Sequence, residues 1–147
     1  SELQLSLGRF TLFGWLTWTR GQLTLDLPGA FSEPADRIPP LNGLGGVRYL
    51  SADERWEARF AVRWAARQDR LSSADRGDPA ICLAGPDGCR GTPGYAAFQL
   101  GGAAKLHELL RLTVDLRNLT NESYRTHGSA LDRPGLSAVV GMELVVR

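Results

Sequence analysis

The clearest pattern in this chain is the strict alternation of apolar and polar residues over positions 56–67. One set of alternate positions is entirely apolar, and the other set carries Glu57, Arg59, Arg63 and Arg67. A period of two residues is typical of a β-strand with two different faces. A helix would spread the tryptophans and arginines around its whole circumference, so the alternation predicts a strand.

This predicted strand has the length and aromatic spacing of a strand that crosses a membrane. Strands in soluble proteins have about 5–6 residues, whereas a tilted strand needs about 9–11 to cross a bilayer. Trp56 and Trp64 lie near the two ends of its apolar face. At a tilt of about 45° they are separated by roughly 19 Å along the membrane normal, close to the spacing of aromatic girdles in an outer-membrane barrel. The alternative is an amphipathic strand of a secreted soluble β-sandwich that serves as a binding module.

Similar patterns predict six further strands. The clearest of them alternates Leu110, Leu112, Val114 and Leu116 with Arg111, Thr113, Asp115 and Arg117. The seven predicted strands cover residues 3–7, 10–19, 41–51, 56–67, 95–104, 109–117 and 137–146.

The connections between these strands are alternately short and long. Short turns are predicted at 8–9, 52–55 and 105–108, and long loops at 20–40, 69–94 and 118–135. A soluble sandwich has no reason to sort its loops in this way, whereas an outer-membrane barrel has short periplasmic turns and long extracellular loops. The chain is therefore predicted to be all-β and to supply about seven strands of a transmembrane antiparallel β-barrel.

The odd number of strands predicts that other strands complete the barrel. Complete single-chain barrels of this kind have an even strand number, and an open sheet would leave two unpaired edges in lipid. We therefore expect a larger chain, or an upstream part, to supply the remaining strands, with the break in an extracellular loop. A small autonomous outer-membrane barrel is the alternative that the odd number disfavours.

Overall composition adds little to this picture, but the two cysteines indicate a further structural feature. A net charge of +1 gives no reason to expect a nucleic-acid partner, and no apolar run approaches the roughly 18 residues of a membrane-spanning helix. The first residues do not resemble a signal peptide, so we expect a mature chain or a piece of a longer one. Cys82 and Cys89 lie close together in a Gly- and Pro-rich loop, which predicts a disulfide on the extracellular side.

Several segments resemble late-barrel sequences of TonB-dependent outer-membrane receptors. Their order and spacing hold over nearly the whole chain, and one of them is similar to the "ENLxDxxYR" segment of that family. The segments are Arg37-Ile38-Pro39-Pro40-Leu41-Asn42-Gly43, Val47-Arg48-Tyr49, Trp56, residues 68–75, Thr92-Pro93-Gly94-Tyr95, Arg117-Asn118-Leu119-Thr120-Asn121-Glu122-Ser123-Tyr124-Arg125, Thr126-His127-Gly128-Ser129 and Pro134-Gly135.

The resemblance implies a 22-stranded barrel around an N-terminal plug, with these strands as the last seven. Such receptors lie in the outer membrane of Gram-negative bacteria and take up ferric siderophores, cobalamin or similar scarce nutrients, driven by the TonB complex. Residues 1–147 would then be the C-terminal part of the barrel, and a larger partner chain would carry the plug and contact TonB. The family typically ends on an aromatic residue, from which Val145-Val146-Arg147 departs.

The alternation assigns the candidate site residues to two faces. Predicted to face lipid are Trp56, Ala58, Phe60, Val62, Trp64, Leu110, Leu112, Val114 and Leu116. Predicted to face the lumen are Arg59, Arg63, Arg67, Arg111 and Arg117. These arginines either pair with Glu57, Asp115, Glu143 and plug carboxylates, or form an electropositive wall for an anionic ligand such as a ferric siderophore.

Other candidate chemistry is sparse. His107 and His127 are isolated and are interpreted as solvated or capping residues, and Asp69, Asp75 and Asp78 are weak candidates for a calcium site. No Ser/His/Asp arrangement, phosphate-binding loop or pair of catalytic carboxylates is evident. We therefore expect a protein that is not an enzyme and that holds no metal or cofactor.

Overall fold

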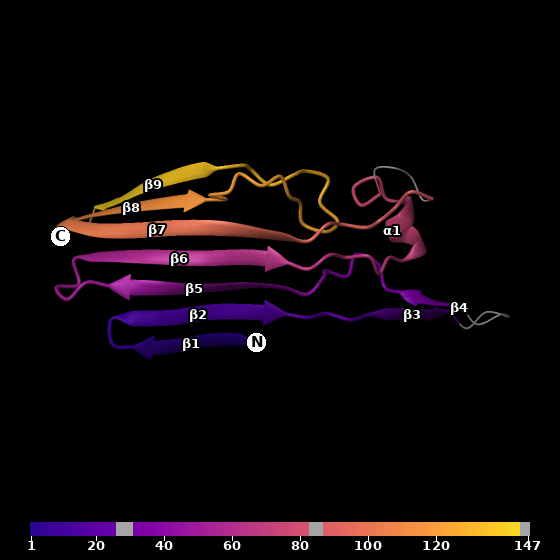
Figure 1. The fold of residues 1–147 in the computed structure, drawn as a ribbon, viewed down its shortest axis with the longest axis horizontal. Coiled ribbons are helices and arrows are strands. Elements are labelled where there is room, and N and C mark those ends of the chain that lie inside the picture. Colours follow the sequence, from indigo (N-terminus) through magenta and orange to yellow (C-terminus); the bar gives the residue numbers. More distant parts are fainter. Residues whose placement is uncertain (26–30, 83–86, 145–147) are drawn as a thin grey trace.

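One antiparallel sheet forms most of the molecule (Figure 1). The structure is a computed structural model that describes residues 1–25, 31–82 and 87–144. Seven strands pair in the order β1-β2-β5-β6-β7-β8-β9, so each pairs with its neighbour along the chain. They are β1 (Glu2–Leu7), β2 (Phe10–Thr17), β5 (Asn42–Leu50), β6 (Trp56–Ala65), β7 (Tyr95–His107), β8 (Leu110–Arg117) and β9 (Ser137–Leu144).

Short turns gather at one end of this sheet and long connections at the other (Figure 1). The turns after β1, β5 and β7 lie at the left, which we call the turn end; the opposite end is the loop end. Gly8 and Glu54 adopt φ angles of 61° and 55° in two of these turns, a conformation that tight reversals require. The predicted seven strands and the sorting of their connections are confirmed, while Val145 and Val146 of the last predicted strand lie outside the described residues.

The strand register separates the sheet into an apolar face and a polar face. One row across the sheet pairs Leu5, Leu12, Val47, Phe60, Leu100, Leu116 and Ala138. The next row pairs Ser6, Thr11, Arg48, Arg59, Gly101, Asp115 and Val139. Because partners in one row share a face, we call the face that carries Phe60 the apolar face and the face that carries Arg59 the polar face.

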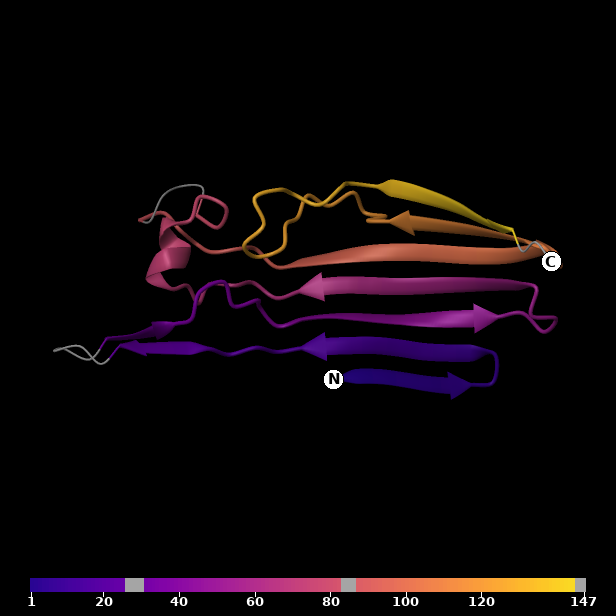
Figure 2. The same cartoon turned by 180° about the vertical axis from the view of Figure 1, so that it is seen from behind.

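Neither face of the sheet is covered by another layer of the described chain. The two opposite views show no helix or second sheet over the strands (Figures 1 and 2). Large side chains of the apolar face are therefore exposed, among them Phe60 at 41% and Val140 and Met142 at 67% each. A soluble β-sandwich would bury this face against a second sheet, so the described residues do not have that architecture. The edge strands of the sheet, β1 and β9, do not pair with each other. The described residues therefore do not form a small closed barrel either.

Two long connections contain secondary structure that the sequence did not predict. Residues 20–40 include a hairpin of β3 (Gln22–Leu25) and β4 (Phe31–Pro34), so the prediction of a plain loop is wrong there. Residues 69–94 include helix α1 (Ser73–Gly77), whose N-cap Ser72 and Asp75 form a capping box. No helix in the described part of the chain is long and apolar enough to cross a membrane.

The predicted turn at 105–108 is also wrong in part. Strand β7 runs through Lys105 to His107, and the pairing with β8 shifts in register between these two residues. A register shift of this kind is a β-bulge, which lets a strand continue past an irregular position. Only Glu108 and Leu109 remain to form the turn.

Candidate functional site

A cavity of about 610 Å³ lies over the polar face and extends to the loop end. Strands β6, β7 and β8 form its wall, and the connection 118–135 forms its other side. Its charged lining consists of one carboxylate, Asp115, and the arginines Arg59, Arg63, Arg117, Arg125 and Arg133. The lining is therefore strongly biased towards positive charge, which favours an anion.

Two ion pairs reduce this positive charge. In the loop, Arg125 Nε lies 2.7 Å from Asp132 Oδ1, and the other pair lies on the sheet. Arg59 Nη2 lies 2.5 Å from Asp115 Oδ1, across the intervening strand β7. The row position between the two residues is Gly101, where a Cβ atom would lie 2.6 Å from the Asp115 oxygen. The absence of a side chain at Gly101 thus lets the two residues meet over β7. A further ion pair of the sheet, Arg111 Nη2 to Glu57 Oε2 at 3.4 Å, lies nearer the turn end and outside the cavity.

The remaining cavity arginines of the sheet have no carboxylate partner among the described residues. The Arg63 guanidinium lies 5.7 Å from the ring centroid of Trp15, within the range of a cation–π contact. Arg117 is exposed and makes no ion pair in the described part of the chain. Of the five arginines singled out in the sequence, the structure brings Arg59, Arg63 and Arg117 together in this cavity.

Arg67 lies apart from these three. It follows the end of β6, and its Nε and Nη2 donate hydrogen bonds to the carbonyl oxygen of Arg90 at 3.3 Å and 2.7 Å. This contact joins the end of β6 to the connection that leads into β7.

The connection 118–135 is held in place by Asn118, which is only 3% exposed and has a φ angle of 54°. Its Nδ2 donates to the carbonyl oxygens of Glu122 and Pro134, and its Oδ1 accepts from Glu122 N. The ring of Tyr124 stacks on Tyr95 at a centroid distance of 4.1 Å. These contacts close the loop over the cavity, a role that the sequence did not assign to either residue.

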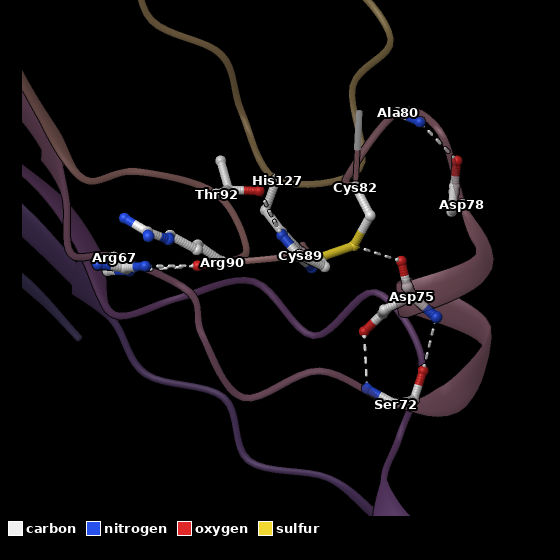
Figure 3. The surroundings of a disulfide bond; sticks show 10 residues. All are labelled: Arg67, Ser72, Asp75, Asp78, Ala80, Cys82, Cys89, Arg90, Thr92 and His127. Carbon is white, nitrogen blue, oxygen red and sulfur yellow. Dashed lines mark hydrogen bonds between the residues drawn. A yellow bond between two sulfur atoms is a disulfide. The ribbon is translucent and has the colours of Figure 1, made fainter. Parts of the chain in front are cut away.

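His127 connects this loop to the preceding long connection. Its Nδ1 lies 2.9 Å from the hydroxyl of Thr92, while its buried Nε2 has no hydrogen-bond partner (Figure 3). Burial lowers the pKa of His127 because it disfavours the charged ring, although the carboxylates of Asp75 and Asp78 act in the opposite direction. Of the two interpretations, solvated or capping, His127 does not fit a fully solvated residue, because it is half-buried between two loops. His107 is exposed, and its Nδ1 accepts from Leu109 N in the adjacent turn.

The predicted disulfide is present between Cys82 and Cys89 (Figure 3). Cys82 is buried with Leu71 and Ile81 in a small apolar cluster, against which Cys89 packs. This cluster gives the connection 69–94 a core of its own, independent of the sheet.

The carboxylates near the disulfide hold backbone groups rather than an ion. Asp75 is 2% exposed and accepts hydrogen bonds from the backbone nitrogens of Ser72 and Arg37. Asp78 accepts from Ala80 N and pairs with Arg37, and these contacts lower the pKa of its carboxyl group. In the described ranges, no three His, Cys, Asp or Glu side chains gather as a metal-binding set.

Comparison with known proteins identifies the architecture. No protein-family model matches the chain, and no curated protein matches it significantly. Among solved structures 27 chains match, including the copper transporter OprC, with a TM-score of 0.69 and 21% identity over 97% of this chain. The fold is that of a transmembrane antiparallel β-barrel. This chain spans 21% of the length of the OprC chain, and its seven strands correspond to a portion of such a barrel.

Proposed function

We propose that this chain is the C-terminal barrel portion of an outer-membrane TonB-dependent transporter that takes up a scarce nutrient. The likeness to an outer-membrane TonB-dependent transporter supports a relation at the level of the barrel. The order of short segments that resemble the TonB-dependent receptors supports the finer assignment. That neighbour is a transporter and not an enzyme, which agrees with the lack of a catalytic arrangement in the sequence.

The observation that carries the proposal is the contrast between the two faces of the open sheet. The apolar face presents exposed leucine, valine and aromatic side chains without a covering layer. The polar face carries the arginines and the cavity. A barrel wall between lipid and an aqueous lumen requires this division, because its strands alternate apolar-out and polar-in. In the proposed orientation Trp56, Phe60, Val62 and Trp64 contact lipid, and Arg59, Arg63 and Arg117 face the lumen.

The cavity supports an anionic cargo. Guanidinium groups bind carboxylate and related oxygens through paired hydrogen bonds. Five of them line the cavity, and two of the five, Arg59 and Arg125, are paired with Asp115 and Asp132. The name of OprC assigns it copper, but the charged lining of this cavity consists mainly of guanidinium groups, which donate hydrogen bonds and do not ligate a metal ion, and His127 is the one imidazole in the lining. We therefore favour an anionic metal chelate, such as a ferric siderophore, over a bare metal ion. Plug carboxylates on the rest of the transporter are the competing partners of these arginines.

The test uses the assembled transporter in detergent and two ferric probes of similar size. One probe is a ferric tris-catecholate, which carries three negative charges, and the other is a neutral ferric tris-hydroxamate. The double variant Arg63→Gln/Arg117→Gln should weaken binding of the anionic chelate by about tenfold or more, because hydrogen bonds to charged groups are lost. Arg111→Gln is the matched control, since Arg111 pairs with Glu57 outside the cavity.

Two outcomes would contradict the proposal. Equal binding of both probes, unchanged by the double variant, would assign the arginines to pairing with the plug. A chain that stays monomeric and soluble in detergent-free buffer would exclude the membrane barrel altogether.

A further inference from the structure

The cavity arginines of the sheet descend the polar face in three successive rows. They pair with alternate positions of β7: Arg63 with Ala97, Arg117 with Gln99 and Arg59 with Gly101. Arg63 is nearest the loop end and Arg59 is nearest the turn end. Successive rows of one face are about 6.8 Å apart, because each step is two residues of about 3.4 Å. The three guanidinium groups therefore form a ladder down the cavity wall.

The partners of these groups change along the ladder. Arg63 lies over the ring of Trp15, and neither Arg63 nor Arg117 has a carboxylate partner in the described ranges. Arg59, in the last row of the cavity, pairs with Asp115. Asp115 is the one carboxylate among the lining residues that the structure describes. The positive charge of the wall is therefore open at the loop end and neutralised towards the turn end.

The contact between Arg59 and Asp115 is easily exchanged. It is a single hydrogen bond, from Arg59 Nη2 to Asp115 Oδ1. Both side chains are partly exposed, and ion pairs of this kind contribute little to stability. A guanidinium group carries five N–H donors and binds anions most strongly through two parallel hydrogen bonds. An anion that presents two oxygens to Arg59 can therefore replace Asp115 as its partner.

We infer that Asp115 is a counter-ion that sets the affinity of the cavity, and that Arg59 exchanges it for an anionic group of the cargo. The inference rests on the proposed function, in which the cargo is an anionic chelate that enters from the loop end. A pore must bind its cargo strongly enough to admit it and weakly enough to let it leave. Arg63 and Arg117 serve the first requirement. Asp115 serves the second, because it competes for Arg59 and repels the cargo at the inner end of the ladder.

Asp115 is thus a positioning residue that acts through Arg59 and does not itself bind the cargo. The variant Asp115→Asn in the assembled transporter removes the charge and keeps the size of the side chain. It should bind ferric tris-catecholate about fivefold more tightly or better, because Arg59 no longer exchanges a partner and the repulsion is lost. The gain should appear mainly as slower dissociation, and it should shrink at high ionic strength. The neutral ferric tris-hydroxamate should bind with unchanged affinity.

Three further variants separate this role from a structural one. Glu57→Gln changes the charge of the transporter equally but releases Arg111 outside the cavity, so it should leave the binding of both probes unchanged. Asp115→Glu keeps the charge and should resemble the wild-type protein. Arg59→Gln/Asp115→Asn should lose the gain, since the gain depends on a free Arg59.

The outcomes distinguish this inference from the proposed function. Unchanged or weaker binding of the anionic probe by Asp115→Asn overturns the inference, and so does an equal gain for both probes. A gain that persists in the double variant overturns it as well, because Arg59 would then have no part in it. Failure of the proposed function has a different signature: the wild-type protein would not distinguish the two probes, Arg63→Gln/Arg117→Gln would have no effect, and the inference would fall with it.

Discussion

Neighbouring residues of β6 face opposite surroundings, and this difference is testable at the middle of the strand. Phe60 lies on the apolar face, where its ring lies 6.2 Å from that of Phe98. An arginine on the lipid face near the midplane costs about 2–4 kcal/mol. Phe60→Arg should therefore reduce the fraction of protein assembled into the outer membrane, measured by the heat-modifiable mobility of the folded barrel.

The adjacent residue supplies the control for this prediction. Arg59 lies on the polar face and pairs with Asp115, and both side chains are partly exposed, at 46% and 29%. Pairs of this exposure contribute about 0–1 kcal/mol, so Arg59→Ala should assemble almost normally. Equal tolerance of the two substitutions would mean that the faces are assigned the wrong way round, as a register error of one residue would produce.

Two neighbouring glycines of β5 make a second contrast at the scale of single residues. A Cβ atom on Gly46 would lie 2.5 Å from the carbonyl oxygen of Phe60 and 2.6 Å from the ring of Phe13, whereas a Cβ on Gly45 would meet nothing within 4 Å. Gly46→Ala should destabilise the barrel by about 1–3 kcal/mol through overpacking. Gly45→Ala should be neutral or stabilise it slightly, because it reduces the freedom of the unfolded chain.

Denaturant unfolding of the refolded barrel in detergent measures both glycine variants. The comparison is internal, since the two positions are adjacent and differ only in the face that the added methyl group enters. A similar loss for both variants would indicate a general cost of side chains in this strand instead of the local contact with Phe13.

At the scale of elements, the contact of His127 with Thr92 predicts that loop docking depends on pH. Burial lowers the pKa of His127 below its ordinary value of 6.5, so the undocked loop binds a proton more readily than the docked one. The stabilisation is present above that ordinary value and is lost as the pH falls towards the lowered one. The protonated ring carries an N–H on both nitrogens, including the buried Nε2, which has no partner among the described residues.

Hydrogen exchange of residues 118–135 at several pH values measures this effect. Exchange should accelerate, relative to the intrinsic rate, as the pH falls below about 6.5. His127→Gln should remove the dependence, because glutamine keeps a polar group near Thr92 but does not titrate in this range. Acceleration of the same size in this variant would assign the effect to groups other than His127.

The elements that the sequence predicted correctly are those with a repeated physical signal. The strands β6 and β8 follow from alternation because each residue contributes to the same two-sided pattern, whereas β2 is predicted from its β-forming residues, with apolar or weakly polar residues on both faces. The hairpin of β3 and β4 has only four residues in each strand, too few to establish a period. Helix α1 has five residues, and its only local signal is Ser72 followed three positions later by Asp75.

The candidate site was predictable only where it belongs to the sheet. Arg59, Arg63 and Arg117 follow from the strand pattern, whereas Arg125, Arg133 and His127 come from a loop whose path depends on tertiary contacts. Asn118 is the residue that sets this path, through three hydrogen bonds within its own loop. An asparagine directly after a strand gives a weak signal for a left-handed turn, but not for the partners that it binds.

The molecule as a whole is built on a single sheet, whose strands are not covered by a helix or second sheet and whose two edge strands are each paired on one side only. In the proposed orientation, the apolar face contacts lipid and the polar face contacts water or a plug. The open edges need more strands, because β1 and β9 each have a partner on only one side in the described chain.

The open edges lead to the last prediction, that this chain lies within a larger closed barrel. Each unpaired backbone N–H or C=O in hydrocarbon costs several kcal/mol, and an edge strand exposes a row of them. Strands β1 and β9 should therefore pair with further strands, about fifteen in a barrel of the proposed family. Purification of the native complex in mild detergent, followed by identification of its polypeptides, should recover these strands and the plug, whether on the same chain or on a partner. Residues 1–147 alone in a folded, closed structure would contradict this, and a small autonomous barrel formed by pairing of β1 with β9 would then replace it.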